Sequence, residues 1–122
     1  MLSPTRRPLD TTIANGAWLT DAIDLDNEVL AAIKTPSVWT TAAISFQASI
    51  DGTNFDDLYD SGGTEVSIAS GNVAANRFVA FQSSLIDLLR GVRYIKIRSG
   101  VTGAPVTQTE LRTLRLSLRQ VA

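Results

Sequence analysis

The sequence predicts an all-β chain, folded as an antiparallel β-sandwich of about eight short strands with one short helix. Two segments, 38–50 and 113–121, alternate apolar and polar residues with the two-residue period of a strand that buries one face. Turn signals such as Asn15-Gly16 and Asp51-Gly52 recur at short intervals between such segments. Short alternating strands separated by frequent turns are typical of sandwiches and not of βαβ folds.

The N-terminal residues differ from the rest. A basic pair, Arg6 and Arg7, lies between two prolines, and proline favours extended backbone. We therefore expect residues 1–9 to form an extended arm, either docked on a neighbouring subunit or simply frayed, and residues 10–122 to form a single β-sandwich domain. Residues 10–14 then begin the first strand.

The best strand pattern lies in the first half of the chain. The apolar segment 29–33 fits a buried strand or a helical turn, and Pro36 ends either one. Segment 38–50 follows, and its alternation places four apolar residues on one face: Ile44, Phe46, Ala48 and Ile50. Asp51-Gly52 then turns the chain, so that segment 55–59 returns as the second strand of a hairpin.

The second half continues with strands at 65–69 and 78–81, and then the β pattern is interrupted. Ser84 with Asp87 three residues later predicts a capping box, and Gly91 suits a helix C-terminus, so one or two helical turns are expected between them. A strand around Ile95 and Ile97 follows. The last segment alternates leucine with polar residues, and a helix would separate Leu116 from the other leucines, so this segment is also a strand.

Composition argues against an enzyme. The chain has no histidine and no cysteine, which excludes Ser-His-Asp and Cys-His nucleophile systems and His- or Cys-based metal sites. Adjacent strand residues point to opposite faces, so Asp56 and Asp57 do not form a hydrolytic carboxylate pair. The acidic run from Asp21 to Glu28 is interpreted as a solvated face in preference to a calcium site. We expect no catalytic residue, no cofactor and no metal.

Targeting signals are also missing from the sequence. There is no run of about 18 apolar residues, so no membrane-spanning helix and no membrane partner are expected. The N-terminus lacks the apolar region of a signal peptide, and we expect synthesis in the cytoplasm of the host cell without secretion by a signal peptide.

The net charge of −1 hides an asymmetry along the chain. Residues 1–76 hold three bases and ten acids, a net charge of −7, and residues 77–122 hold eight bases and two acids, a net charge of +6. Acidic and basic strands that lie side by side would neutralise each other within one chain. Alternatively, identical chains meet acidic face to basic face, in a heterologous contact. Nucleic-acid binding is disfavoured, because the total charge is close to zero.

A family resemblance adds to this interpretation. The segment from Ile44 to Asp60, with Ser49, Asp51-Gly52 and Phe55, and the later Arg93–Ile97 strand resemble the discoidin-like, galactose-binding-like domains over about residues 38–119. The resemblance implies a jelly-roll type of sandwich, with Phe55 folded over the hairpin as an aromatic plug. Phe55 stands where the family prefers tryptophan, and the N-terminal ligand-binding loops of the family are short here. Sugar binding, including binding to cell-surface carbohydrate, is therefore the alternative function.

A looser resemblance to small structural proteins of tailed bacteriophages implies a non-enzymatic virion component that decorates the head, sits at a fibre or spike base, or joins the neck or tail. Its partners would be other virion proteins and further copies of itself. Aromatic and basic residues are the side chains expected at its interfaces: Arg6, Arg7, Trp18, Trp39, Arg93, Lys96, Arg98, Arg115 and Arg119. If the strands that carry the last five were neighbours, these bases would make one basic face together with Arg112.

Overall fold

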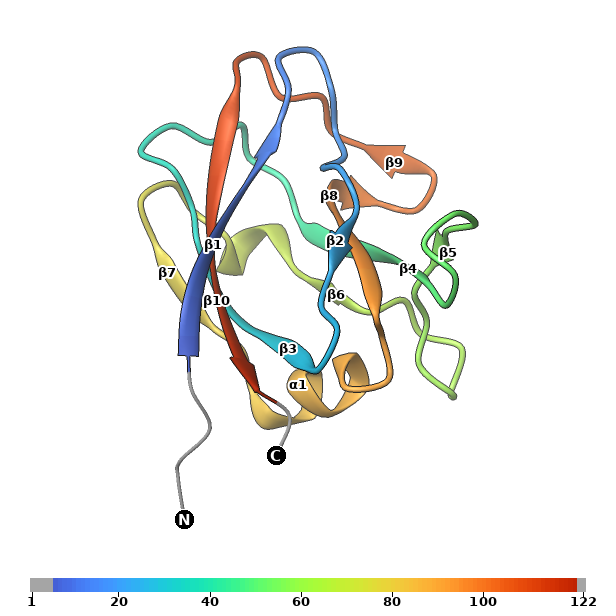
Figure 1. The fold of residues 1–122 in the computed structure, drawn as a ribbon. Coiled ribbons are helices and arrows are strands. Elements are labelled where there is room, and N and C mark those ends of the chain that lie inside the picture. Colours follow the sequence, from blue (N-terminus) through green and yellow to red (C-terminus); the bar gives the residue numbers. More distant parts are fainter. Residues whose placement is uncertain (1–5, 121–122) are drawn as a thin grey trace.

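The computed structural model describes residues 6–120, which form two antiparallel sheets, one α-helix and one 3-10 turn (Figure 1). The elements in chain order are β1 (Arg6–Ile13), β2 (Ile23–Asp24), β3 (Glu28–Lys34), β4 (Ile44–Ser49), β5 (Asp56–Asp57), β6 (Ser67–Ile68), η1 (Ser70–Asn72), β7 (Phe78–Ala80), α1 (Ser83–Leu89), β8 (Tyr94–Val101), β9 (Ala104–Pro105) and β10 (Arg112–Gln120). The predicted all-β sandwich with one short helix is therefore confirmed at this level. Segment 29–33, whose pattern also fitted a helical turn, lies within strand β3.

The first sheet has the strand order β1-β10-β3-β7, and the second has the order β2-β8-β4-β5. Strand β6 also pairs with β4, and β9 extends the second sheet beside β8. All of these neighbouring strands run antiparallel. The two long C-terminal strands, β8 and β10, therefore lie in different sheets and are not neighbours.

The core lies between the two sheets, and strict alternation explains which side chains reach it. Leu114, Leu116 and Leu118 of β10 are almost completely buried, while the intervening residues face the other side of the sheet. The opposite sheet contributes Phe46 of β4, whose ring packs edge-on against Phe81 with the ring centroids 6.3 Å apart. This contact joins the two sheets, and deleting either ring would leave a destabilising cavity between them.

Strand β4 ends one residue earlier than its alternation predicts. Ser49 Oγ accepts hydrogen bonds from the backbone N–H groups of Asp51 and Gly52, at 3.2 and 2.9 Å, and these bonds begin the turn. Ile50 is consequently outside the strand and 95% exposed, so its predicted place on the buried face is wrong. A local side-chain bond to the backbone has replaced the sheet pairing that would have continued the alternation.

The boundary of the predicted arm also needs correction. Residues 6–9 are the first half of β1, where Arg6 lies opposite Arg119 and Leu9 lies opposite Leu116. Pro8 fits this position because β1 is the edge strand of its sheet. Residues 1–5, the rest of the predicted arm, lie outside the described residues.

The helix forms where the sequence predicts it, but without the predicted caps. Helix α1 begins after Gln82, which makes no side-chain capping hydrogen bond. Asp87 instead pairs with Arg90 at 3.2 Å, and Gly91 does not adopt the left-handed conformation of a glycine cap. The apolar face of the helix, which includes the fully buried Leu89, packs against the core and fixes the helix beside β3.

Candidate interaction surfaces

The acidic first half and the basic second half of the chain neutralise each other at several points, as one of the two interpretations predicted. Two exposed ion pairs join the halves, Arg93–Asp24 and Arg115–Asp10, both at 3.1 Å. A third exposed pair, Arg7–Glu28 at 2.7 Å, lies within the first half. The guanidinium of Arg93 donates to Asp24 and lowers the pKa of that carboxyl. Asp24 and Glu28 of the acidic run are thus engaged by arginine.

Arg98 is the centre of a fourth, buried ionic cluster. Its side chain is only 4% exposed, and its guanidinium donates to Asp57 Oδ1 at 2.5 Å and to Glu65 Oε2 at 2.6 Å. Ser45 Oγ and Thr102 Oγ1 accept from the same group at 2.8 and 2.9 Å. The hydrogen bond from Arg98 lowers the pKa of the Asp57 carboxyl. Arg98 therefore binds strands and loops of its own chain together, and it offers nothing to a partner.

The structure separates the bases that the sequence grouped in one face. Arg93, Lys96 and Arg98 belong to the β8 side of the sandwich, whereas Arg112, Arg115 and Arg119 belong to β10 in the other sheet. A single basic face of all six residues is therefore not formed. The Lys96 Nζ lies over the ring of Phe55, 4.5 Å from its centroid, so the predicted plug residue is engaged by a cation.

The two tryptophans differ in exposure. Trp39 is 8% exposed and packs in the core, where its indole Nε1 has no hydrogen-bond partner among residues 6–120. Trp18 is half-buried, and its backbone carbonyl accepts a hydrogen bond from the Ser99 N–H at 2.8 Å. Stacking of a ligand on Trp39 would need the core to open.

One surface is the tip of the hairpin between β4 and β5, which we call the acidic tip: Ile50, Asp51, Thr53, Asn54 and Asp56. The backbone N–H groups of Asn54 and Thr53 donate to Asp51 Oδ1 at 2.9 and 2.8 Å and hold the pKa of Asp51 far below its usual range. Gly52 has a φ of +80°, and a Cβ there would lie 3.2 Å from the Tyr94 ring, so this turn requires glycine. The result is a hydrogen-bonded loop in which the exposed Ile50 lines the same shallow hollow as Asp51 and Asp56.

A second surface is the outer face of the first sheet, which we call the basic face: Arg6, Pro8, Lys34, Phe78, Arg115, Ser117 and Arg119. Most of these residues line a shallow groove of about 400 Å³. Phe78, on the edge strand β7, is 64% exposed beside Lys34. Three of the predicted interface residues, Arg6, Arg115 and Arg119, are therefore together here.

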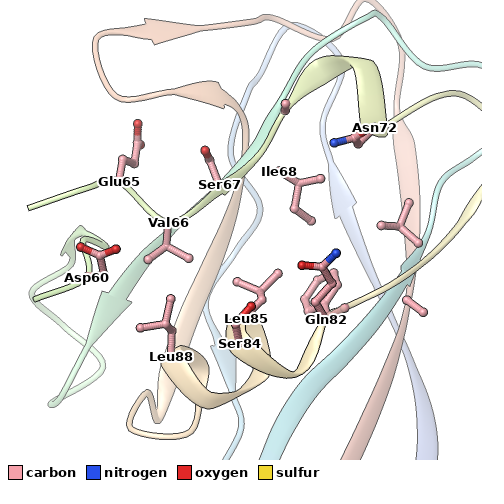
Figure 2. A pocket seen from close by; sticks show the side chains of 14 residues that line it. Asp60, Glu65, Val66, Ser67, Ile68, Asn72, Gln82, Ser84, Leu85 and Leu88 are labelled. Carbon is pink, nitrogen blue, oxygen red and sulfur yellow. The ribbon is translucent and has the colours of Figure 1, made fainter. Parts of the chain in front are cut away.

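A third surface is a groove of about 620 Å³ between β6, β7 and α1, larger than the groove on the basic face (Figure 2). Val66 and Ile68 form one wall, and Leu85 and Leu88 of the helix face them. Asp60 and Glu65 lie at one end of the groove and Asn72 lies at the other. The sequence predicted the helix but not this groove, because a local sequence pattern does not show how a helix packs against strands elsewhere in the fold.

Residues 6–120 contain no cluster of three or more acidic side chains placed to hold a metal ion. Among the same residues, no helix is long and apolar enough to span a membrane. Comparison of the chain with protein-family models, with curated proteins and with solved structures found no match.

Proposed function

We propose that this chain is a structural subunit that acts through protein–protein contacts and has no enzymatic activity. More specifically, we propose a virion component of a tailed bacteriophage, acting in head decoration, at a fibre or spike base, or as a neck or tail adaptor. The observation that carries the proposal is the presence of large exposed apolar side chains on separate surfaces, Ile50 at 95% and Phe78 at 64%. An apolar side chain surrounded by charged groups supplies the two parts of a protein interface, an apolar centre and a polar rim.

The rest of the charged surface supports this proposal. Most of the exposed arginines outside the basic face are held by a carboxylate of the same chain, as Arg7, Arg90 and Arg93 are. Side chains held in this way are not free to bind or transform a substrate. Trp39, buried in the core, is likewise a packing residue. These features suit a subunit that acts by presenting contact surfaces to other proteins.

We also propose that the sandwich is a jelly roll. An eight-stranded jelly roll results when a long hairpin rolls up, so that strand one pairs with eight, two with seven, three with six and four with five. If β5 and β6 count as one interrupted strand and β9 is left out, the observed pairs β1–β10, β2–β8, β3–β7 and β4–β5/β6 follow this scheme. Jelly rolls occur in viral capsid proteins and in lectins, so the fold suits both candidate functions and decides neither.

The direct test is whether the chain is part of a particle. Phage particles from the source of this chain would be purified on a density gradient and probed with an antibody against the purified chain. We expect the chain in the particle band, with immunogold label at one defined place on the virion. A chain that stays at the top of the gradient, with no label on particles, would contradict the virion proposal.

Carbohydrate binding is the second candidate, and the groove beside α1 favours it. The Asn72 and Gln82 side chains line this groove and can each donate to and accept from sugar hydroxyls. Its one aromatic side chain, Phe81, is 8% exposed, so no open stacking platform is present there. Binding on a glycan array that is lost in Asn72→Ala and kept in a surface control such as Thr107→Ala would establish this alternative.

A further inference from the structure

The basic face carries like charges placed directly opposite one another. In the register of the first sheet, Arg6 lies opposite Arg119, and Arg115 lies opposite Lys34. Within residues 6–120, Asp10, opposite Arg115, is the one carboxylate on the outward positions of this face. Like charges directly opposite on neighbouring strands destabilise a sheet. Such local conflicts are expected where function, and not stability, determines the residues.

Apart from Arg115, which pairs with Asp10, the bases of this pattern have no carboxylate partner among the residues that the structure describes. Arg6 and Arg119 make no ion pair within residues 6–120. Lys34 Nζ donates only to neutral acceptors, the Thr35 carbonyl and Asn76 Oδ1, at 2.9 and 2.8 Å. An acidic partner on this face would therefore meet cations that are not already neutralised, and it would cover the exposed ring of Phe78.

The same chain carries a complementary surface. The acidic tip has one exposed apolar side chain, Ile50, beside the carboxylates of Asp51 and Asp56. The basic face has one large exposed hydrophobic side chain, Phe78, beside cations. In Figure 1 the strands β1, β7 and β10 lie on one side of the molecule, and β5, which follows the tip, lies on the other.

We propose that copies of this chain associate head to tail, with the acidic tip of one copy seated on the basic face of the next. This inference rests on the proposed assembly function and names its first contact. Because the two surfaces differ and lie on opposite sides, the contact is heterologous and produces rings or filaments, not closed two-fold dimers. The net charge of −1 adds no long-range repulsion between copies and gives little attraction to nucleic acid.

The proposed contact is smaller than a standard stable interface. A standard stable interface takes about 800 Å² from each partner, roughly a tenth of the 6773 Å² accessible surface of this chain. A hairpin tip in a shallow groove covers less than this, so we expect weak association that many equivalent contacts reinforce in a particle. Charge contributes much of the attraction, so association should weaken strongly between about 10 mM and about 1 M salt, as the Debye length falls from about 30 to about 3 Å.

The test is sedimentation velocity on the intact chain and on two charge-reversal variants. The basic-face variant carries Arg6→Glu and Arg119→Glu, and the tip variant carries Thr53→Lys and Asp56→Lys. We expect each variant alone to associate at least about tenfold more weakly than the wild type, a loss of about 1.4 kcal/mol. An equimolar mixture of the two variants should recover association, because every tip then meets a face of opposite charge. A two-fold contact between two basic faces would instead leave the tip variant associating as strongly as the wild type.

Two further measurements separate contact from folding. Arg119→Glu creates an opposite-charge pair with Arg6, so its thermal midpoint should equal or exceed that of the wild type while its association falls. Ile50→Ser should weaken association, whereas Leu111→Ser, at a 62% exposed control position, should not.

The possible failures are distinguishable. A wild type that associates as strongly as both charge variants overturns the head-to-tail contact and leaves the assembly function standing. A wild type that stays monomeric but binds a single-stranded oligonucleotide through Arg6 and Arg119 also overturns it, and assigns the basic face to nucleic acid. Absence of the chain from particles, in the gradient experiment, would overturn the virion proposal on separate grounds.

Discussion

Replacing Arg98 by methionine tests whether the buried ionic cluster holds the second sheet together. Arg98→Met keeps much of the side-chain volume but deletes a guanidinium whose bonds reach Asp57 and Glu65. Each hydrogen bond to a charged partner contributes about 1.5–3 kcal/mol. Because both carboxylates are only partly buried, water compensates some of the loss when the cation is removed. We therefore expect the free energy of unfolding to fall by about 3–4 kcal/mol, near the lower end of the range for breaking a buried pair.

The carboxylate side of the cluster gives a sharper result. Asp57→Asn or Glu65→Gln alone leaves Arg98 with one counterion and should cost about 1–2 kcal/mol. Together they leave a cation that is 4% exposed without any counterion, so the double variant should cost more than the sum of the single variants. Coupling between contacting residues is typically about 0.5–3 kcal/mol.

The assay is urea unfolding at neutral pH, followed by the fluorescence of Trp18 and Trp39, with the wild type and the four variants compared at equal denaturant slope. A double variant that is additive within about 0.5 kcal/mol would refute the reasoning, because it would mean that water and not the two carboxylates balances Arg98.

Three other predictions follow from the fold. Gly100 has a φ of +101°, and a Cβ there would lie 2.5 Å from the Ala104 carbonyl oxygen. Gly63 has a similar φ of +84°, but a Cβ there would meet open space. In urea unfolding, Gly100→Ala should therefore lower the free energy of unfolding by about 3 kcal/mol or more, and Gly63→Ala by about 1 kcal/mol. Phe46→Ala should cost about 3–5 kcal/mol because Phe46 is fully buried, while Phe78→Ala should change stability by less than about 0.5 kcal/mol; an equal loss in both would contradict the division into core and contact residues. The pKa of Asp57 is lower in the folded state than in the unfolded state. Its contribution to stability is therefore present above the unfolded pKa of about 3.9 and is lost as the pH falls through the lower folded value. Acid titration should show this loss of stability in the wild type and a smaller loss in Arg98→Met.

The sequence predicts where the strands of this fold lie better than it predicts which strands pair with each other. Leu114, Leu116 and Leu118 reach the core because alternation is a local property of the chain, and local pattern reveals it. Which strand pairs with which is decided by packing across the whole molecule. For that reason the separation of β8 and β10 into different sheets, and with it the division of the basic residues, could not be predicted.

The sequence likewise predicts some residues of the candidate surfaces and misplaces others. Arg115 and Arg119 could be proposed as interface residues from charge alone, but Arg98 looks the same in the sequence and is buried in the fold. Ile50 could not be separated from Phe46, because a serine-to-backbone bond at the strand end moves it out of the alternation. Side-chain hydrogen bonds of this kind compete with sheet pairing and leave only a weak trace in a sequence pattern.

The most direct test of the account is the mass of the purified wild-type chain in solution, measured by light scattering after size exclusion at low and high salt. Head-to-tail association predicts a weight-average mass above the 13.1 kDa of one chain at about 10 mM salt, increasing with protein concentration and falling toward 13.1 kDa at about 1 M salt. A mass of 13.1 kDa at every salt and concentration would contradict charge-driven self-association and would give weight to carbohydrate binding in the groove beside α1.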